Sequence, residues 1–156
     1  MRPTKPHSIN DLMQRVNAIA GLTLGQLASQ YSFKTPDDLL REKGWTGQLI
    51  EYVLGATAGS KPLPDFEDLG VELKTLPISY KGKPLETTFV SVTPLINVTG
   101  MTWHTSAVRK KLNHVLWLPI LSERDITPFD RTIGSGFLWQ PTPEQDALLQ
   151  RDWEEQ

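Results

Sequence analysis

Apolar side chains recur at intervals of three and four residues through the first third of the chain, a spacing that is typical of amphipathic helices. Ser8 and Asp11 form a capping-box pattern before apolar side chains at positions 12, 16 and 20, and Gly21 can end the resulting helix. A second capping box, Thr23 with Gln26, predicts a short helix directly afterwards. The N-terminal third is therefore expected to be helical.

Two more helices are predicted before the pattern changes. Thr35 followed by Pro36 places an N-cap before a proline at the first helical position. A longer helix is expected from about Thr46 to Leu54, with an apolar stripe facing the core and Gly55 as its terminator. This helix carries one acidic side chain, Glu51, beside the stripe.

A loop rich in glycine, proline and small side chains, residues 55–65, separates the helices from a region of alternating polarity. Polar and apolar side chains alternate from Gly70 to Leu76, which predicts a strand with Glu72 and Lys74 together on one face.

The chain after this strand continues with turn and strand patterns. Residues 81–84 are a predicted turn, and the β-branched stretch 87–92 is expected to pair with the first strand as a hairpin. Thr105 or Ser106 can cap a short basic helix that carries Arg109, Lys110 and Lys111. Further strands are predicted at 114–121 and 137–139.

A last helix is predicted from Thr142 and the proline that follows it, with Leu148, Leu149 and Trp153 on its apolar side. Neither Gly, Asn nor Pro follows before Gln156, so the chain is expected to end short of its natural boundary. A frayed C-terminal helix is the alternative interpretation.

Together these elements predict one α/β domain over residues 1–156, a mixed β-sheet flanked by helices. A chain of 156 residues is long enough for one substantial core. Hydrophobic residues make up 38% and charged residues 22%, a balance that excludes intrinsic disorder.

The absence of cysteine excludes disulfides, thiolate zinc sites and a cysteine nucleophile. The three histidines have no metal-ligand spacing, so zinc is not expected. The sequence contains neither a signal-peptide core nor an apolar stretch of about 20 residues, so we expect a cytoplasmic protein without a membrane anchor.

The net charge of −2 argues against nucleic-acid binding, because duplex affinity depends largely on phosphate neutralisation by Lys and Arg. The charge is uneven, however. Residues 61–111 hold seven Lys and Arg against five Asp and Glu, whereas residues 112–156 hold three against eight. The middle of the chain is therefore mildly basic, and the acidic excess lies after it.

One group of residues has the pattern of a metal-dependent phosphodiesterase site. Asp65 follows a proline, and six residues separate it from Glu72-Leu73-Lys74. Glu72 and Lys74 share a strand face and lie roughly 6.5 to 7 Å apart along the strand. Taken alone, the pattern is common and is more often a solvated strand face.

The residue types fit Mg²⁺ chemistry if the fold brings them together. Mg²⁺ takes oxygen ligands, usually one or two carboxylates with phosphate and water, and Asp65 and Glu72 can supply them. The bound ion polarises a phosphoryl oxygen and lowers the pKa of its water. Lys74 can then orient or deprotonate the attacking water and offset developing charge.

Other candidates carry little weight from the sequence alone. Glu51 has the pattern of a surface helix glutamate, and the run Arg109-Lys110-Lys111 is most often a solvated face that could also meet phosphates. The loop 55–61 contains glycines and a lysine, but its spacing and its position after a helix do not fit a phosphate-binding loop, so it is interpreted as a connector.

Longer stretches of the sequence resemble a known family. The segments GQLIEYVLGATAGSKPLPDFEDLGVELKTLP, KPLETTFVSVTPL and TSAVRKKLNHVLWLP, after Lys43-Gly44-Trp45, are similar to the MutH family of methyl-directed mismatch-repair endonucleases and to related restriction enzymes that cut GATC. The resemblance covers nearly the whole chain. It implies a PD-(D/E)xK core with a restriction-endonuclease-like fold.

The resemblance also implies roles for individual residues. Asp65, Glu72 and Lys74 fall on the family's metal-binding and catalytic positions, with one or two Mg²⁺ ions as cofactor. Glu51 falls on an upstream helix glutamate of the site and Lys111 on a lysine near it. Two further residues, Lys43 and Phe89, fall on positions associated with DNA contact.

By the same resemblance, the protein is expected to nick the unmethylated strand of hemimethylated GATC sites in double-stranded DNA, as a monomer activated by a MutL-type repair protein. The family extends past the end of this chain, so a C-terminal region carrying DNA-recognition contacts is expected to be missing. Two alternatives remain open. One is a restriction-type GATC endonuclease without a repair partner, and the other is a non-catalytic DNA-binding module.

Overall fold

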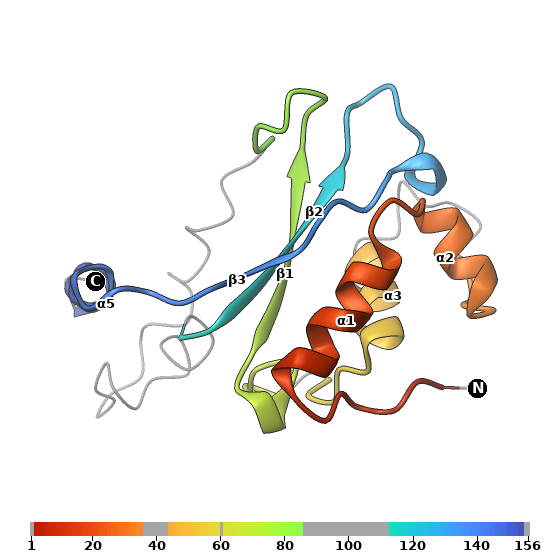
Figure 1. The fold of residues 1–156 in the computed structure, drawn as a ribbon. Helices are drawn as coiled ribbons and strands as arrows, with labels where there is room; N and C mark the ends of the chain where they lie inside the picture. Colours follow the sequence, from red (N-terminus) through yellow and green to blue (C-terminus); the bar gives the residue numbers. More distant parts are fainter. Residues whose placement is uncertain (1, 36–43, 60, 86–112, 155–156) are drawn as a thin grey trace.

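Helices cover one face of a mixed three-stranded sheet in the computed structural model, which describes residues 2–35, 44–59, 61–85 and 113–154 (Figure 1). The elements follow one another as three helices, two parallel strands, a short antiparallel strand and a final helix. This arrangement confirms the predicted α/β class and the mixed sheet.

Local capping explains where the first two helices begin. In α1 (Ile9–Ile19), the Ser8 hydroxyl accepts a hydrogen bond from the Asp11 N–H at 3.0 Å. The Asp11 carboxylate in turn accepts from the N–H of His7 at 2.9 Å, one residue before the position that a standard capping box uses. In α2 (Leu24–Gln30), both bonds of the predicted capping box are present.

The helix predicted at 46–54 is α3 (Trp45–Leu54), which begins one residue earlier than expected. Gly55 ends it with φ of 81°, in the left-handed region where glycine is favoured. Its buried side chains form one stripe that joins the core with those of α1: Trp45, Leu49, Ile50, Val53 and Leu54. The helix predicted to start at Thr35 and Pro36 falls on residues outside the described part.

The sheet has the order β1-β2-β3, with β1 (Glu72–Ile78) parallel to β2 (Val115–Leu121) and β2 antiparallel to β3 (Phe137–Trp139). β1 lies two residues later than the predicted range 70–76, β2 begins one residue later than predicted, and β3 has the predicted bounds. Glu72 pairs with Val115, so the two parallel strands start side by side.

The predicted turn at 81–84 is confirmed. Gly82 has φ of 77°, and the Ser79 N–H donates to the Lys83 carbonyl at 2.8 Å. An antiparallel bridge between Ile78 and Pro84 starts a return along β1. The strand predicted at 87–92, which should continue this pairing, lies outside the described residues.

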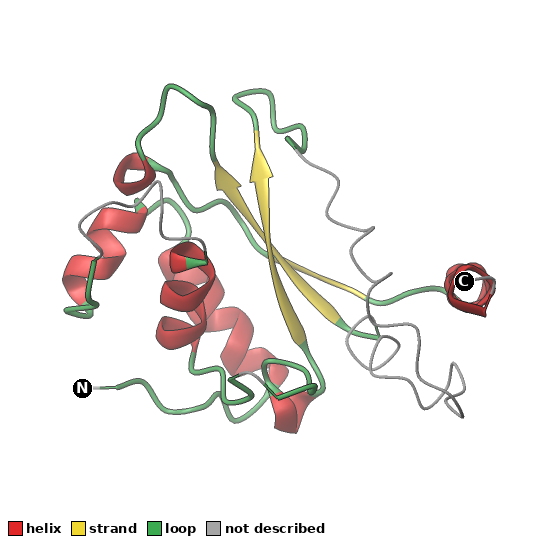
Figure 2. Ribbon diagram, turned by 180° about the vertical axis from the view of Figure 1, so that it is seen from behind, coloured by secondary structure: helices red, strands yellow, loops and turns green. Residues whose placement is uncertain are grey.

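The helices α1 and α3 lie side by side against the sheet, and α2 lies farther out beside the short helix η4 (Pro128–Asp130) (Figure 2). The core fills the space between α1, α3 and the first two strands, and includes Leu12, Val16, Leu49, Ile50, Val71, Leu116 and Leu118. This packing places the end of α3 next to the start of β1.

The last helix, α5 (Pro143–Glu154), lies apart from the other helices in both views. Its predicted apolar side is correct for Leu149, which is buried, but wrong for Leu148, which is 53% exposed. Adjacent residues in a helix point about 100° apart, so a contact that buries Leu149 can leave Leu148 in solvent. The side chain of Trp153 is outside what the structure describes.

No helix in the described residues is both long enough and apolar enough to cross a membrane.

Candidate active site

Glu51 projects from the last turn and a half of α3, near the end that faces the start of β1. The side chain is half-buried, unlike the surface glutamate that its helix position alone suggests. Its backbone carbonyl accepts the Ala56 N–H at 2.9 Å, because the helix closes around Gly55. This closure fixes the direction in which the chain leaves the helix.

The loop 55–65 holds the backbone of Asp65 in place. The Asp65 carbonyl accepts hydrogen bonds from the N–H groups of Thr57 at 2.9 Å and Ala58 at 3.3 Å. The loop is thus more than the connector inferred from its sequence, since it supports a candidate site residue. Its run of small side chains is the signal that could have indicated so close a backbone approach.

The side chain of Asp65 is fixed by the next turn of the chain. Residues 66 and 71 form an antiparallel bridge around the short helix η1 (Glu67–Leu69), and Gly70 closes it with φ of 67°. The chain therefore doubles back, and the Asp65 Oδ2 accepts the Leu73 N–H at 2.9 Å. The carboxylate of Asp65 lies against the backbone between Glu72 and Lys74.

Glu72 is buried, with only 3% of its surface exposed, and among the described residues it is the only buried polar or charged one. Its N–H donates to the His114 carbonyl at 2.9 Å, where the two parallel strands begin. A buried carboxylate is costly unless its charge is compensated. The solvated-face interpretation is therefore wrong for Glu72.

Lys74, two residues along the same strand face, is exposed. The face that alternation predicted is thus buried at its acidic end and open to solvent at its basic end.

Glu51 and Asp65 interact directly, and the pKa of Glu51 is raised from 4.5 to about 7. Burial is the largest cause, followed by the negative charge of Asp65 and a hydrogen bond between the two side chains. Near neutral pH the pair therefore retains a proton much of the time. A bound cation would offset the negative charge of the two carboxylates.

The donor set suits a hard divalent cation. All candidate ligands are carboxylates, and Mg²⁺ binding usually needs only one or two of them. Asp65 and Glu72 are positioned by adjacent backbone, through the bond from Leu73 to Asp65. In the described part of the chain, no three Asp, Glu, His or Cys side chains form one group with metal-ligand spacing. Glu51 contacts Asp65, one of these two candidate ligands.

The structure brings four of the predicted residues to one region: Glu51 and Asp65 in contact, and Glu72 and Lys74 on either side of the residue that binds Asp65. The other three, Lys43, Phe89 and Lys111, lie outside the described residues. The predicted basic helix that carries residues 109–111 lies there as well.

Comparison with known proteins identifies relatives over almost the entire chain. The family model for the DNA mismatch repair enzyme MutH matches residues 54–152, a range that contains Asp65, Glu72 and Lys74.

Among curated proteins, the chain is 58% identical to the DNA mismatch repair protein MutH of Shewanella woodyi, over 98% of this chain and 66% of the relative. It is 56% identical to the protein of that name from Shewanella amazonensis, over 98% of this chain and 68% of the relative. It is 54% identical to that from Vibrio cholerae, over 99% of this chain and 70% of the relative. The chain spans about two thirds of the length of these relatives.

Proposed function

This chain belongs to the MutH family of DNA mismatch repair enzymes, and we propose that it nicks the unmethylated strand of hemimethylated GATC sites by Mg²⁺-dependent hydrolysis. Members of the family are DNA mismatch repair endonucleases, which generally use a divalent metal. The proposal concerns which DNA strand is cut, at which sequence, and with which metal ion. It extends to double-stranded DNA as substrate, a MutL-type activator, a monomeric state and a cytoplasmic location.

One observation carries the proposal: Asp65 binds the backbone of Leu73, between a buried acid and an exposed amine on β1. We assign Asp65 and Glu72 as the Mg²⁺ ligands. When bound, the ion supplies Lewis-acid activation of the scissile phosphate and a water of lowered pKa.

Lys74 has the position and the chemistry for proton transfer and for stabilisation of negative charge in the reaction. Its amine is exposed on the strand face where a phosphate can approach, two residues from Glu72. There it can orient the attacking water, accept its proton and offset negative charge on the phosphoryl oxygens. An arginine could not readily release the proton, which explains why lysine suits this position.

Glu51 supports the site from α3. Its contact with Asp65 restrains that carboxylate and holds a proton close to it near neutral pH. We further propose that Lys111 lies near the same site and that Lys43 and Phe89 contact the DNA, as the family resemblance implies. A carboxylate site that binds DNA needs such cationic groups, because phosphate neutralisation supplies most of the affinity.

The proposal is tested with a plasmid that carries a single hemimethylated GATC site, incubated with the chain, Mg²⁺ and a MutL-type protein. We expect nicked circles with the break in the unmethylated strand, and no product from Asp65→Asn or in EDTA. Linear DNA without the activator would instead indicate a restriction-type enzyme. DNA binding without cleavage, together with no Mg²⁺ binding by calorimetry, would indicate a non-catalytic module.

A further inference from the structure

The N-terminal segment, residues 2–7, lies across the two parts of the chain that carry Glu51 and Asp65. At one end, the guanidinium of Arg2 is 6.0 Å from the ring centre of Tyr52, the neighbour of Glu51 on α3. At the other end, Lys5 forms an ion pair with Asp68 in η1, three residues after Asp65. The segment therefore contacts α3, which carries Glu51, and η1, which follows Asp65. Figure 1 shows its backbone leading into α1.

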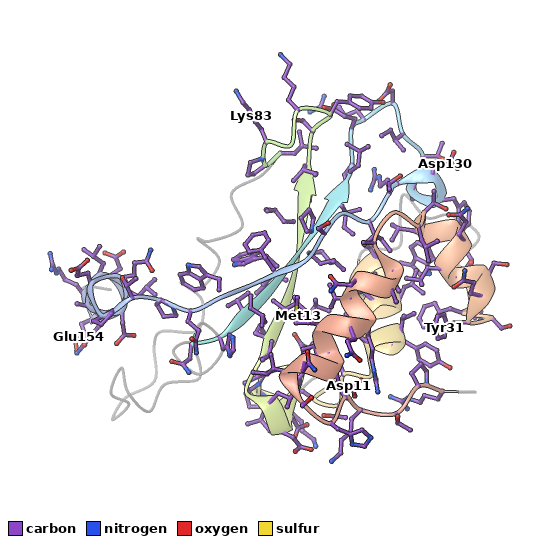
Figure 3. All side chains as sticks on the ribbon, in the orientation of Figure 1. Asp11, Met13, Tyr31, Lys83, Asp130 and Glu154 are labelled. Carbon is purple, nitrogen blue, oxygen red and sulfur yellow. The ribbon has the colours of Figure 1, made fainter. Side chains whose placement is uncertain are left out.

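A single side chain, Arg15 of α1, ties this segment to the end of α3. Its guanidinium donates to the carbonyls of Thr4 and Lys5 in the segment, and to the Leu54 carbonyl at 3.3 Å. It also donates to the Asp11 carboxylate at 3.3 Å. Asp11 lies at the start of α1, where Figure 3 labels it. A guanidinium has five donors in a rigid fork, so it can join three parts of the backbone at once.

The close packing at Gly55 is independent evidence that the segment is seated on α3. A Cβ at Gly55 would clash with the Thr4 carbonyl oxygen and would lie 3.0 Å from the Arg15 Nη1. Pro6, beyond this point in the segment, is buried and lines a small cavity with Phe66. Residues 4–6 thus form a seam, the line of contact that joins the end of α3 to the turn after Asp65.

We propose that Arg15 is a positioning residue for the Glu51–Asp65 pair. It binds the Leu54 carbonyl at the residue before Gly55, and the loop that starts at Gly55 supplies the Thr57 N–H that holds Asp65. Loss of the guanidinium releases the segment from the end of α3, and the loop then has fewer contacts that fix the Asp65 carboxylate on Leu73. The consequence for Mg²⁺ binding and cleavage rests on the proposed function, whereas the positioning itself does not.

Amide hydrogen exchange tests the positioning directly, because the amides of Thr57 and Leu73 both donate to Asp65. In Arg15→Ala we expect these two amides to exchange about tenfold faster, as local opening becomes easier. Arg15→Lys should show a similar increase, since one ammonium retains the charge next to Asp11 but cannot span the same acceptors.

The matched control is Thr23→Ala, which removes the cap of α2 and destabilises the fold without touching the seam. Unchanged exchange at Thr57 and Leu73 in both Arg15 variants would overturn the proposal. So would an increase no larger than in the control, or one shared equally by the amides of β2. If the Arg15 variants fail to fold, Gly55→Ala disturbs the same seam from the loop side and is expected to give the same local increase.

Calorimetric titration with Mg²⁺ alone provides the functional measurement. We expect several-fold weaker binding in Arg15→Ala than in the unaltered chain and no such weakening in Thr23→Ala. Unaltered Mg²⁺ affinity in a folded Arg15→Ala protein would overturn the expected consequence for Mg²⁺ binding. If the unaltered chain neither binds Mg²⁺ nor nicks DNA, the proposed function fails, while the exchange result still decides the role of Arg15.

Discussion

Glu72 and Lys74 lie on the same face of one strand, yet one is buried and the other is exposed. The difference separates the two tasks that a phosphodiesterase site requires. The buried carboxylate of Glu72 can hold a cation away from bulk water. The exposed amine of Lys74 can contact the phosphate and the attacking water.

Replacement of Lys74 by alanine should therefore affect hydrolysis more than DNA binding. We expect single-turnover nicking to fall by about 10² to 10⁴-fold, the range typical of a lost general acid–base group. DNA affinity, measured by fluorescence anisotropy with Ca²⁺ in place of Mg²⁺, should change little, because one of many phosphate contacts is lost.

Lys81→Ala is the matched control, since Lys81 is also exposed but lies in the turn beyond the far end of β1. It should retain nicking. Cleavage at the normal rate by the Lys74 variant would remove this residue from the mechanism.

The raised pKa of Glu51, caused first by burial and then by Asp65, makes folding stability depend on pH. The folded protein retains the Glu51 proton up to about pH 7, whereas an ordinary glutamate loses it near 4.5. Stability from this group is thus fully present below pH 4.5 and is lost as the pH rises through 7. In Glu51→Gln the amide cannot ionise, so this loss should disappear.

The measurement is urea unfolding in EDTA at pH 4.5 and pH 8, with Glu144→Gln as a control for the removal of one exposed negative charge. Relative to the unaltered chain, Glu51→Gln should gain stability at pH 8 and show little gain at pH 4.5. A variant whose stability difference is the same at both values would rule out the raised pKa of Glu51 as a contribution to folding.

At the level of elements, α3 contains a glycine, Gly47, at a position where the structure does not require glycine. Gly47 is the third residue of the helix, its φ is not positive, and a Cβ there would meet no heavy atom within 4 Å. Gly47→Ala should stabilise the protein by about 0.5–1 kcal/mol, because alanine loses less backbone entropy in a helix. Thermal or urea unfolding provides the test, and a lower stability would show that the helix needs the glycine.

At the level of the whole molecule, Gly136 lies where α1 packs on the sheet. A Cβ there would be 2.5 Å from the Val16 Cγ1 and 3.2 Å from the Leu118 Cδ1, both in the buried core. The close approach of helix and sheet therefore depends on the missing side chain.

Gly136→Ala should destabilise the fold by about 1–3 kcal/mol, as expected for an overpacked core. The Gly47→Ala variant is its matched control, because the same substitution in the same chain should change stability in the opposite direction. Equal effects of the two substitutions in urea unfolding would contradict the packing described for Gly136.

The sequence by itself determined the features that depend on neighbouring residues. The capping box of Thr23 and Gln26, the end of α3 at Gly55 and the bounds of β3 all agree with the structure, since caps and turns involve residues only a few positions apart. Composition limited any metal to oxygen or imidazole ligands, and the local motif together with the family resemblance selected the acidic candidates.

Tertiary structure alone decided how those candidates meet. The parallel pairing of β1 with β2, the burial of Glu72 and the contact of Glu51 with Asp65 join residues that are far apart in sequence. Alternation predicts which side chains share a strand face, but only the elements packed on that face determine whether a carboxylate is in water or buried. The same limit explains Leu148, whose exposure depends on which narrow side of α5 is covered.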